Sequence, residues 1–356
     1  MISIIGAGPV GSYTAYLLAK NNQEVNIFED HSEIGKPVQC TGIVTSELEK
    51  IIPLNKKFLV NKVNKVKVVF PNNKDIELNL KKPNLVLDRG KFDKFLAEKA
   101  EKAGANIFLN HKFLDFKKPY LIFEDKKSYK TDILIGADGP SSRVAKSTGL
   151  YGKREFVIGL QARISSRFEK KLVEFYLDKH YFGWVVPEST DIARVGIATK
   201  NNAKFHFKDF LKRVDKKYKT IEYQSGIMPI YNPDIQTEKD GVYLVGDAAT
   251  MVKPTTYGGI VQGLMAAEEL SNAIIQHKDY ERLWKHRIGK ELNYGLMIRK
   301  VMDKFSNEDY NELADLVDRR DIKKILSNLD REFPSKIIFN LAIKQPKLLK
   351  FIKKMY

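Results

Sequence analysis

The sequence is poor in cysteine and contains no long hydrophobic run. Cys40 is the single cysteine among 356 residues, which excludes an internal disulfide and any metal or iron–sulfur site built from several thiolates. A lone thiol suits the reducing cytoplasm, where we expect the protein. No stretch of about 18 uncharged apolar residues occurs, so we expect no membrane-spanning helix and at most a peripheral position on the inner face of the membrane.

Acidic residues are fewer than basic ones. The chain has 44 Asp and Glu against 61 Lys and Arg, a net charge of +17 at pH 7, which attracts anionic partners. The basic residues are dispersed among acids rather than set along one motif, which argues against nucleic-acid binding. The six histidines fall in no metal-ligand spacing, so we assign no metal. Apolar residues make up 43% of the chain, and this length predicts two folded domains.

The alternation of apolar strands and helical patterns predicts an α/β fold. Ile2–Ile5 is expected as a buried strand, Pro9–Lys20 as a helix and Glu24–Phe28 as a second strand, a βαβ unit. Beyond residue 277 only helices are expected. The other expected elements are strands at Lys65–Phe70, Asp75–Leu80, Tyr120–Glu124, Asp132–Ile135, Val157–Ile164, Leu172–Leu177, Gly183–Val186, Ala193–Ala198 and Val242–Val245, and helices at Phe92–Ala103 and Ile260–Gln276.

A glycine-rich turn joins the first strand to the first helix. In the G-A-G-P-V-G run, Gly6 permits a tight turn, Gly8 lets a pyrophosphate approach the backbone, and Gly11 lets helix and strand pack closely. Pro9 has no N–H to lose in the first helical turn. Glu29 ends the second strand, where a carboxylate accepts hydrogen bonds from an adenosine ribose. These residues predict a dinucleotide site.

A second turn lies far downstream, in the G-V-Y-L-V-G-D-A-A run that follows the strand near Val242. Asp247 could bind the hydroxyls of a ribityl chain, which FAD has and NAD lacks. Gly258 and Gly259 open the helix that begins at Ile260, whose N-terminal dipole can face the pyrimidine edge of a flavin. This turn favours FAD over NAD.

With Asp138 in a third segment, D-G-P-S-S, these motifs resemble the three FAD signatures of flavoproteins of the para-hydroxybenzoate hydroxylase fold. The resemblance implies a Rossmann-like FAD-binding domain of the glutathione-reductase type, an inserted antiparallel β-sheet substrate domain and a C-terminal helical region. It implies an FAD-binding domain of residues 1–55, 89–150 and 240–276, a substrate domain of 56–88 and 151–239, and a basic helical region of 277–356. Arg89 matches an Arg that many members place near the FAD pyrophosphate.

Two further segments resemble the geranylgeranyl reductase family. K-P-V-Q-C-T-G around Cys40 is similar to the family's segment beside the flavin, and Tyr181, Trp184 and Pro187 belong to a Y-F-G-W-V-V-P run similar to its lipid-pocket segment. The resemblance implies an FAD-dependent reductase that saturates C=C bonds of geranylgeranyl chains in archaeal-type glycerophospholipid precursors.

Reducing an isolated alkene requires a proton on one carbon and a hydride on the other, in a dry and apolar site. Cys40 is the candidate near the flavin, either as a participant or as a small packed side chain. Tyr181 and Trp184 could wall an isoprenoid and shield a developing cation, or could be ordinary sheet core. The sequence leaves both questions open.

Partners follow from charge and from the tail. The sequence has one glycine signature and so predicts no second, nicotinamide-binding domain. Electrons are therefore expected from a donor that binds transiently. An acidic ferredoxin-like donor suits the positive charge, and NAD(P)H or a deazaflavin stays an alternative. The tail Gln345–Tyr356 sets Leu348, Ile352 and Met355 on one helical face beside lysines, which suits an anionic membrane surface or a solvated cap.

Two other functions share parts of this pattern. An aromatic-ring hydroxylase of the same fold uses the same FAD signatures with O₂, and a prenyl-lipid carrier keeps the fold without flavin chemistry. The Cys40 and Tyr181–Pro187 segments favour the reductase over the hydroxylase, and Glu29 and Asp247 argue against the carrier.

Overall fold

The chain begins with the predicted βαβ unit: β1 (Ile2–Ile5), α1 (Pro9–Lys20) and β2 (Val25–Phe28). The structure is a computed structural model that describes residues 1–214, 217–328 and 330–355, without the side chain of Met355. β1 lies at the centre of a six-stranded sheet. The order of that sheet is β16 (Glu238–Lys239), β17 (Val242–Leu244), β10 (Ile133–Gly136), β1, β2 and β6 (Asn106–Phe108), and all its pairs are parallel except β16–β17.

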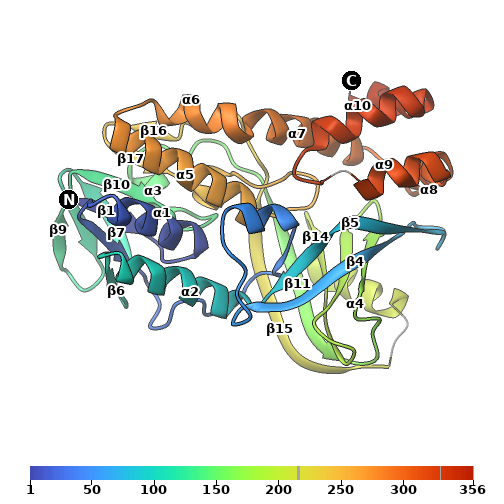
Figure 1. The fold of residues 1–356 in the computed structure, drawn as a ribbon, viewed down its shortest axis with the longest axis horizontal. Coiled ribbons are helices and arrows are strands. Elements are labelled where there is room, and N and C mark those ends of the chain that lie inside the picture. Colours follow the sequence, from blue (N-terminus) through green and yellow to red (C-terminus); the bar gives the residue numbers. More distant parts are fainter. Residues whose placement is uncertain (215–216, 329, 356) are drawn as a thin grey trace.

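Three helices, α1, α2 (Arg89–Lys102) and α5 (Ile260–Gln276), lie side by side along this sheet (Figure 1). α2 begins at Arg89, three residues before the predicted start, because the Asp88 side chain caps it by accepting a hydrogen bond from the Lys91 N–H at 3.0 Å. A small sheet of β7 (Phe113–Lys117), β8 (Tyr120–Phe123) and β9 (Ser128–Lys130) packs on the parallel sheet, with the Phe28 and Phe123 rings 4.7 Å apart.

A second large sheet of eight strands fills the other half of the molecule (Figure 1). It brings together strands from two distant stretches of the chain, because β12 pairs in parallel with β4. Its order is β15 (Lys219–Pro229), β11 (Phe156–Ser165), β14 (Ile192–Thr199), β13 (Phe182–Pro187), β12 (Leu172–Leu177), β4 (Leu59–Val69), β5 (Asp75–Leu87) and β3 (Ile43–Val44). The fold class predicted from the sequence, a Rossmann-like domain with an added β-sheet, is confirmed.

The two faces of the eight-stranded sheet are covered by different helices. α4 (Ala203–Arg213), which the strand pattern did not predict, packs Phe207 and Phe210 against one face. The C-terminal helices cover the other face through an apolar cluster that includes Phe305, Tyr310 and Phe351. These C-terminal elements are α6 (Tyr280–Trp284), η3 (Lys285–Gly289), α7 (Lys290–Met302), α8 (Asn307–Val317), α9 (Arg320–Asn328), α10 (Pro334–Lys344) and η4 (Pro346–Met355).

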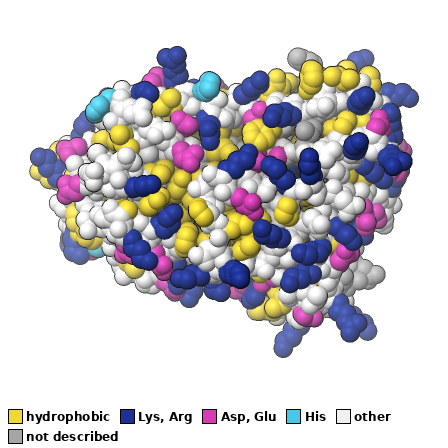
Figure 2. Space-filling view, in the orientation of Figure 1, with side chains coloured by type: hydrophobic (Ala, Val, Ile, Leu, Met, Phe, Trp, Pro, Cys, Tyr) yellow, Lys and Arg dark blue, Asp and Glu magenta, His cyan; other side chains and the backbone are white. Residues whose placement is uncertain are grey.

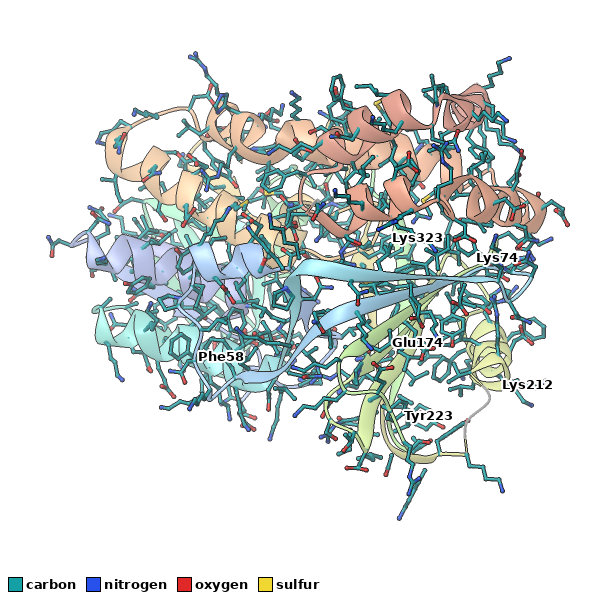
Figure 3. The ribbon with its side chains drawn as sticks, turned by 45° about the vertical axis from the view of Figure 1, so that its right-hand side comes forward. Phe58, Lys74, Glu174, Lys212, Tyr223 and Lys323 are labelled. Atoms are coloured by element: carbon teal, nitrogen blue, oxygen red, sulfur yellow. The ribbon has the colours of Figure 1, made fainter. Side chains whose placement is uncertain are left out.

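Ion pairs hold the C-terminal helices to the sheet. Figure 3 shows Lys74, in the turn between β4 and β5, near Lys323 of α9; their Nζ atoms lie 3.0 and 2.6 Å from carboxylate oxygens of Asp318. The C-terminal helices are therefore fixed against one face of the eight-stranded sheet and can form one wall of a cavity on that side. Within the described part of the chain, no helix combines the length and apolar character needed to cross a membrane.

The tail differs from its prediction as an amphipathic α-helix. η4 is a 3₁₀ helix, in which the turn is tighter and the predicted face rotates. Leu348 is half-buried against the C-terminal core, Lys350 pairs with Glu312, and the Lys354 Nζ lies 2.7 Å from Asp309. Met355, the third residue of the predicted face, has its side chain outside the described part, and Tyr356 lies outside it entirely.

Candidate active site

A cavity of about 610 Å³ lies between the two large sheets. Its volume is within the range of small-molecule and cofactor sites. One end is bordered by the turn between β1 and α1, and the other by side chains of the eight-stranded sheet. The predicted site residues on its lining are Gly6, Gly8, Pro9, Glu29, Cys40, Arg89, Asp138, Trp184, Asp247, Gly258, Gly259 and Ile260.

The glycine turn is shaped by three different constraints. Gly6 has a φ of +101°, and a Cβ there would lie 2.5 Å from the Ala137 carbonyl oxygen. Gly11 does not line the cavity; a Cβ there would lie 2.0 Å from the Gly6 carbonyl oxygen, so it allows α1 to approach the strand. A Cβ on Gly8 would meet nothing within 4 Å, so this position opens onto free space at the N-terminus of α1.

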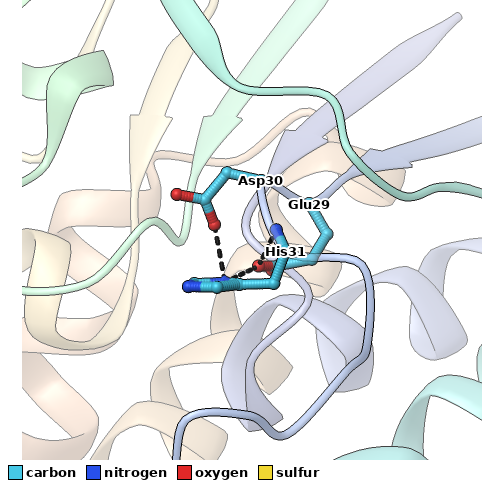
Figure 4. A group of neighbouring side chains, drawn as sticks. All are labelled: Glu29, Asp30 and His31. Atoms are coloured by element: carbon cyan, nitrogen blue, oxygen red, sulfur yellow. Dashed lines mark hydrogen bonds and ion pairs between the residues drawn. The ribbon is translucent and has the colours of Figure 1, made fainter.

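Glu29 is already engaged at this end of the cavity (Figure 4). One carboxylate oxygen accepts the Ala7 N–H at 2.8 Å, and the other lies 2.5 Å from the His31 Nδ1. Burial raises the pKa of Glu29, while the contacts with Ala7 and His31 lower it. Asp30 also pairs with His31, and ligand atoms of the three residues lie within 4.8 Å of one another, near enough to share a cation. The spacing of the histidines had not indicated this grouping.

Asp138 is committed to local structure. Its carboxylate accepts hydrogen bonds from the Ser142 hydroxyl at 2.6 Å and from the Val144 N–H at 3.1 Å, at the start of α3 (Arg143–Ser147). Burial raises its pKa, and those hydrogen bonds oppose the rise. Arg154, which the sequence reading missed, donates to the carbonyl oxygens of Pro140 and Ala248 and so ties this segment to the Asp247 turn.

The Asp247 carboxylate has no partner among the described residues. It lies in η2 (Gly246–Ala249), beside the start of α5, where a Cβ on Gly259 would lie 2.7 Å from its Oδ1. Burial raises its pKa to about 6, against the opposing charge of Arg89. Arg89 itself forms a two-pronged ion pair with Asp93, at 3.0 and 3.1 Å. The cavity thus contains one carboxylate whose oxygens are free to accept hydrogen bonds.

The loop that carries Cys40 is fixed from the eight-stranded sheet. Arg194 of β14 donates to the carbonyl oxygens of Thr41 and Leu87, and its own charge is balanced by Glu188 at 2.8 Å. The Thr41 hydroxyl donates to Gln161 at 2.9 Å. Cys40 is half-buried and accepts the Gly42 N–H at 3.3 Å. Its thiol therefore lies at the cavity wall in a loop held from two directions.

Aromatic side chains form the far end of the cavity. Phe175 and Phe182 stack with ring centroids 5.5 Å apart, and Trp184 lies beside them with its Nε1–H donated to Gln161 at 3.1 Å. Tyr181 and Pro187, which the sequence suggested as substrate-binding residues together with Trp184, are not on the lining of this cavity, because side chains alternate in direction along an extended chain. Tyr181 points to the opposite face and packs on Phe210 of α4, and Pro187 is also outside the cavity lining.

The C-terminal region, which bears no sequence motif, also reaches the cavity. Arg331, between α9 and α10, lines it. The adjacent Glu332 is buried and accepts hydrogen bonds from Lys253 at 2.5 Å, Gln262 at 2.8 Å and Thr45 at 2.9 Å. These bonds connect the stretch between α9 and α10 to both halves of the molecule. Six residues of the site were not predicted from the sequence. Phe182 belongs to the Y-F-G-W-V-V-P run but was not selected there, and the other five stand in no local pattern: Gln161, Phe175, Lys253, Arg331 and Glu332.

Comparison with known proteins agrees with this architecture. Residues 4–41 match the NAD(P)-binding Rossmann-like domain family. The chain is 29% identical to digeranylgeranylglycerophospholipid reductase of Methanocaldococcus jannaschii, with 99% of this chain and 97% of the relative covered. It is 30% identical to digeranylgeranylglycerophospholipid reductase 3 of Methanosphaera stadtmanae, with 91% and 92% covered.

Solved structures extend the comparison. A geranylgeranyl bacteriochlorophyll reductase-like protein from Thermoplasma acidophilum superposes with a TM-score of 0.87 at 25% identity, covering 100% of this chain and 98% of that one. The halogenase PltM, solved in complex with FAD, gives a TM-score of 0.67 at 14% identity, covering 99% and 95%. The second likeness shows the fold alone.

Proposed function

The chain belongs to the digeranylgeranylglycerophospholipid reductase family, and we propose on that basis that it is an FAD-dependent reductase. Its substrates are the C=C bonds of geranylgeranyl chains in archaeal-type glycerophospholipid precursors. The observation that carries the proposal is that one cavity is lined by the Gly8 turn, by Cys40 and by Trp184. A cofactor held at one end and a hydrocarbon held at the other meet beside Cys40.

The residues at the nucleotide end fit FAD. Gly8 leaves open space where a Cβ would stand, which suits a pyrophosphate at the N-terminus of α1. Asp247 offers carboxylate oxygens without a donor, which suits the hydroxyls of a ribityl chain. In the proposal Glu29 holds the adenosine ribose, Arg89 and Asp138 shape the pyrophosphate side, and Gly258, Gly259 and Ile260 face the flavin ring. Gly6, Pro9 and Gly11 set the turn.

FAD, when bound and reduced, supplies the hydride for one alkene carbon. The chain's own side chains supply the surroundings of that transfer. Phe175, Phe182 and Trp184 exclude water and present aromatic faces to positive charge that develops on the alkene. Cys40 lines the same cavity, and in the proposal its thiol assists the proton transfer to the other carbon.

An anaerobic single turnover tests the reaction type. The protein is reduced in advance, freed of oxygen and mixed with a geranylgeranyl glycerophospholipid, and we expect saturated product within one turnover. An aromatic-ring hydroxylase would form product only after oxygen is added. A purified protein without flavin absorbance would instead revive the carrier alternative.

Substitution of the thiol tests the role of Cys40. We expect Cys40→Ala and Cys40→Ser to keep FAD and to lose about tenfold or more in lipid saturation, since the hydrogen bonds of Arg194 and Thr41 still hold the loop when the contact of the thiol with the Gly42 N–H is lost. Flavin reduction by the electron donor serves as the control and should be unchanged. Full saturation activity in both variants would leave Cys40 as a packing residue.

The division of labour follows the two sheets. We assign FAD binding to residues 1–55, 89–150 and 240–276, lipid binding to 56–88 and 151–239, and closure of the cavity to the basic helical region 277–356. The assignment is supported by the sheet membership of every strand in these ranges except β3 and β16, each of which joins the other sheet, and by Arg331 of the C-terminal region on the cavity wall. Its test is cross-linking of a photoreactive prenyl lipid, which should label 151–239 more than 89–150.

An acidic electron donor such as a ferredoxin suits the net charge of +17. Steering by charge weakens as salt screens it, because the Debye length falls to about 3 Å at 1 M ionic strength. Turnover with a protein donor should therefore slow as salt rises, and a salt-independent rate would contradict this choice of donor.

Contact with a membrane surface is supported by exposed apolar side chains at the C-terminus. Phe339 and Ile343 of α10 are 67% and 59% exposed, and Leu349 and Ile352 of η4 are 45% and 44% exposed. Figure 2 shows hydrophobic side chains beside lysines and arginines over this region, at its upper right. We propose peripheral contact with the inner face of an anionic membrane. Sedimentation with anionic vesicles should fall in Phe339→Ser, and equal sedimentation would refute it.

A further inference from the structure

Arg331 is a cavity residue whose hydrogen-bonding capacity is mostly unused. Its Nη2 donates to the Asn84 Oδ1 at 2.7 Å, and its guanidinium carbon lies 5.4 Å from the centroid of the Phe175 ring. A guanidinium has five N–H donors in a planar fork. The contact with Asn84 fixes one edge of the side chain, and the cavity borders the rest.

No acid among the described residues neutralises Arg331 by direct contact. Its sequence neighbours are otherwise engaged: Glu332 accepts from Lys253, Gln262 and Thr45, and Asp330 accepts the Glu332 N–H at 3.0 Å. The Asn84 Nδ2 is buried and has no hydrogen-bond partner in the described structure, and Asn84 lies behind Arg331, outside the cavity lining. A desolvated cation without an anion is costly, which makes this corner attractive to an anionic ligand.

Most other cations on the cavity lining are paired: Arg89 with Asp93, Lys253 with Glu332, Lys36 with Glu33 and Lys112 with Glu124. Arg143, at the start of α3, also lacks an ion pair among the described residues, but it is exposed to solvent, whereas Arg331 is half-buried beside Phe175. The ligand that suits the aromatic end must therefore combine an apolar chain, for Phe175 and its neighbours, with a compact anion for one guanidinium. Phosphate matches the planar fork of arginine by accepting two parallel hydrogen bonds.

We propose that Arg331 binds the phosphate group of the isoprenoid substrate and so sets which substrates enter. The inference rests on the proposed function and identifies the phosphate as the part of the substrate that the protein recognises. Because Arg331 holds the head group, it fixes the position of the prenyl chain along the wall formed by Phe175, Phe182 and Trp184. The flavin end of the cavity is not involved, so FAD affinity should not depend on Arg331.

The experiment compares geranylgeranyl phosphate with geranylgeraniol, which differ only in the anionic group. Affinity of each for the FAD-loaded protein is measured by perturbation of the flavin spectrum, together with anaerobic reduction of each. In Arg331→Met we expect the affinity for the phosphate to fall at least about tenfold and that for the alcohol to change less than about twofold. Arg331→Lys, which keeps the charge and loses the fork, should lie between.

Arg320 is an exposed arginine of α9, and Arg320→Met is the control for the loss of one positive charge. This variant should bind both compounds as the unaltered protein does. Inorganic phosphate at the same concentration should not compete, because it lacks the chain; equal competition would overturn the assignment to a lipid head group. If Arg331→Met does not fold, Arg331→Gln carries the test, since it keeps a donor for Asn84.

Three results separate the possibilities. A preference for the phosphate that survives in Arg331→Met overturns the inference. Equal loss of both compounds in that variant also overturns it, because it shows that Arg331 only anchors the C-terminal segment through Asn84. If the unaltered protein reduces neither these compounds nor a geranylgeranyl glycerophospholipid, the proposed function fails, while the affinities of the two compounds still decide whether Arg331 binds the phosphate.

Discussion

The two ends of the cavity are built in opposite ways. The nucleotide end is made mostly of short segments that follow strands of the parallel sheet, as Gly6–Gly11 does after β1, although Arg89 follows β5 of the other sheet. The lipid end is assembled from β11, β12, β13 and the stretch between α9 and α10, which are far apart in the chain. A shared cofactor demands particular residue types at fixed places, whereas a hydrocarbon chain demands only apolar bulk.

The ends also differ in the charge that they leave unpaired. The nucleotide end holds the Asp247 carboxylate, which suits hydroxyl donors, and the lipid end holds the Arg331 guanidinium, which suits an anion. Each group is desolvated in the protein alone, and a ligand would offset that cost. The comparison teaches that Asp247 and Arg331 differ from the paired polar groups of the cavity, such as Asp138 and Arg89, because their unused hydrogen-bonding capacity suits a ligand.

The largest effect is expected in the glycine turn, where fold and cofactor can be separated. Gly11→Ala places a Cβ 2.0 Å from a backbone oxygen, so α1 must move away from β1 at a cost of roughly 3 kcal/mol or more. Gly8→Ala meets nothing within 4 Å, so the protein should fold with an unchanged melting temperature. The added methyl occupies space assigned to the pyrophosphate, and we expect FAD affinity to fall about a hundredfold.

Differential scanning calorimetry of the FAD-free proteins and titration with FAD measure the two effects. Gly8→Ala that binds FAD as the unaltered protein does would move the cofactor away from this turn. Gly11→Ala with normal stability would mean that the helix can retreat at little cost.

This contrast explains what could be predicted from the sequence. The elements Ile2–Ile5, Pro9–Lys20 and Ile260–Gln276 were predicted with their observed bounds, because apolar periodicity and terminal Gly or Pro mark them locally. α4 was missed because its helical face is short and stands among strands. Tyr181 was placed on the cavity because a motif shows which residues recur but not which face of a strand each one takes. Arg331 had no local signal at all.

The next effect concerns the pH dependence of stability at the nucleotide end. Burial raises the pKa of Asp247 in the folded protein to about 6, from 3.8. Between these pH values the folded state retains a proton that the unfolded state has lost, so the contribution of Asp247 to stability falls as pH rises, by about 3 kcal/mol in all. Asp247→Asn removes this dependence, and its FAD-free form should be the more stable one at pH 7.

Urea denaturation of the FAD-free proteins at intervals from pH 4 to 7 gives the difference between the two. Because Glu29 and Asp138 also have raised pKa values, the slope of either protein alone is not diagnostic, and the subtraction isolates Asp247. FAD should bind more weakly to Asp247→Asn. If the free energies of unfolding of the two proteins depend on pH in the same way, the Asp247 carboxylate is solvated in the FAD-free protein and its pKa is not raised by burial.

The smallest effect is expected at the lipid end, where Trp184 of β13 and Tyr181, directly before β13, lie on opposite faces of the sheet. Trp184 lines the cavity and Tyr181 packs on Phe210 behind the sheet. Trp184→Ala removes apolar surface that would contact the prenyl chain, and we expect kcat/KM for the lipid to fall about tenfold, equivalent to about 1.4 kcal/mol. Tyr181→Phe keeps the ring on the far face and should alter kcat/KM less than about twofold.

The pair is informative because both residues belong to the segment that resembles the lipid-pocket motif. The Gln161 Oε1 accepts hydrogen bonds from the Trp184 Nε1–H and from the hydroxyl of Thr41, the residue after Cys40. Trp184→Phe is therefore needed to separate the loss of side-chain bulk from the loss of the hydrogen bond to Gln161. If bulk matters, Trp184→Phe recovers most of the activity. Equal sensitivity of Tyr181→Phe and Trp184→Ala would mean that the lipid approaches from the α4 face, and the distinction between the two ends of this cavity would then be lost.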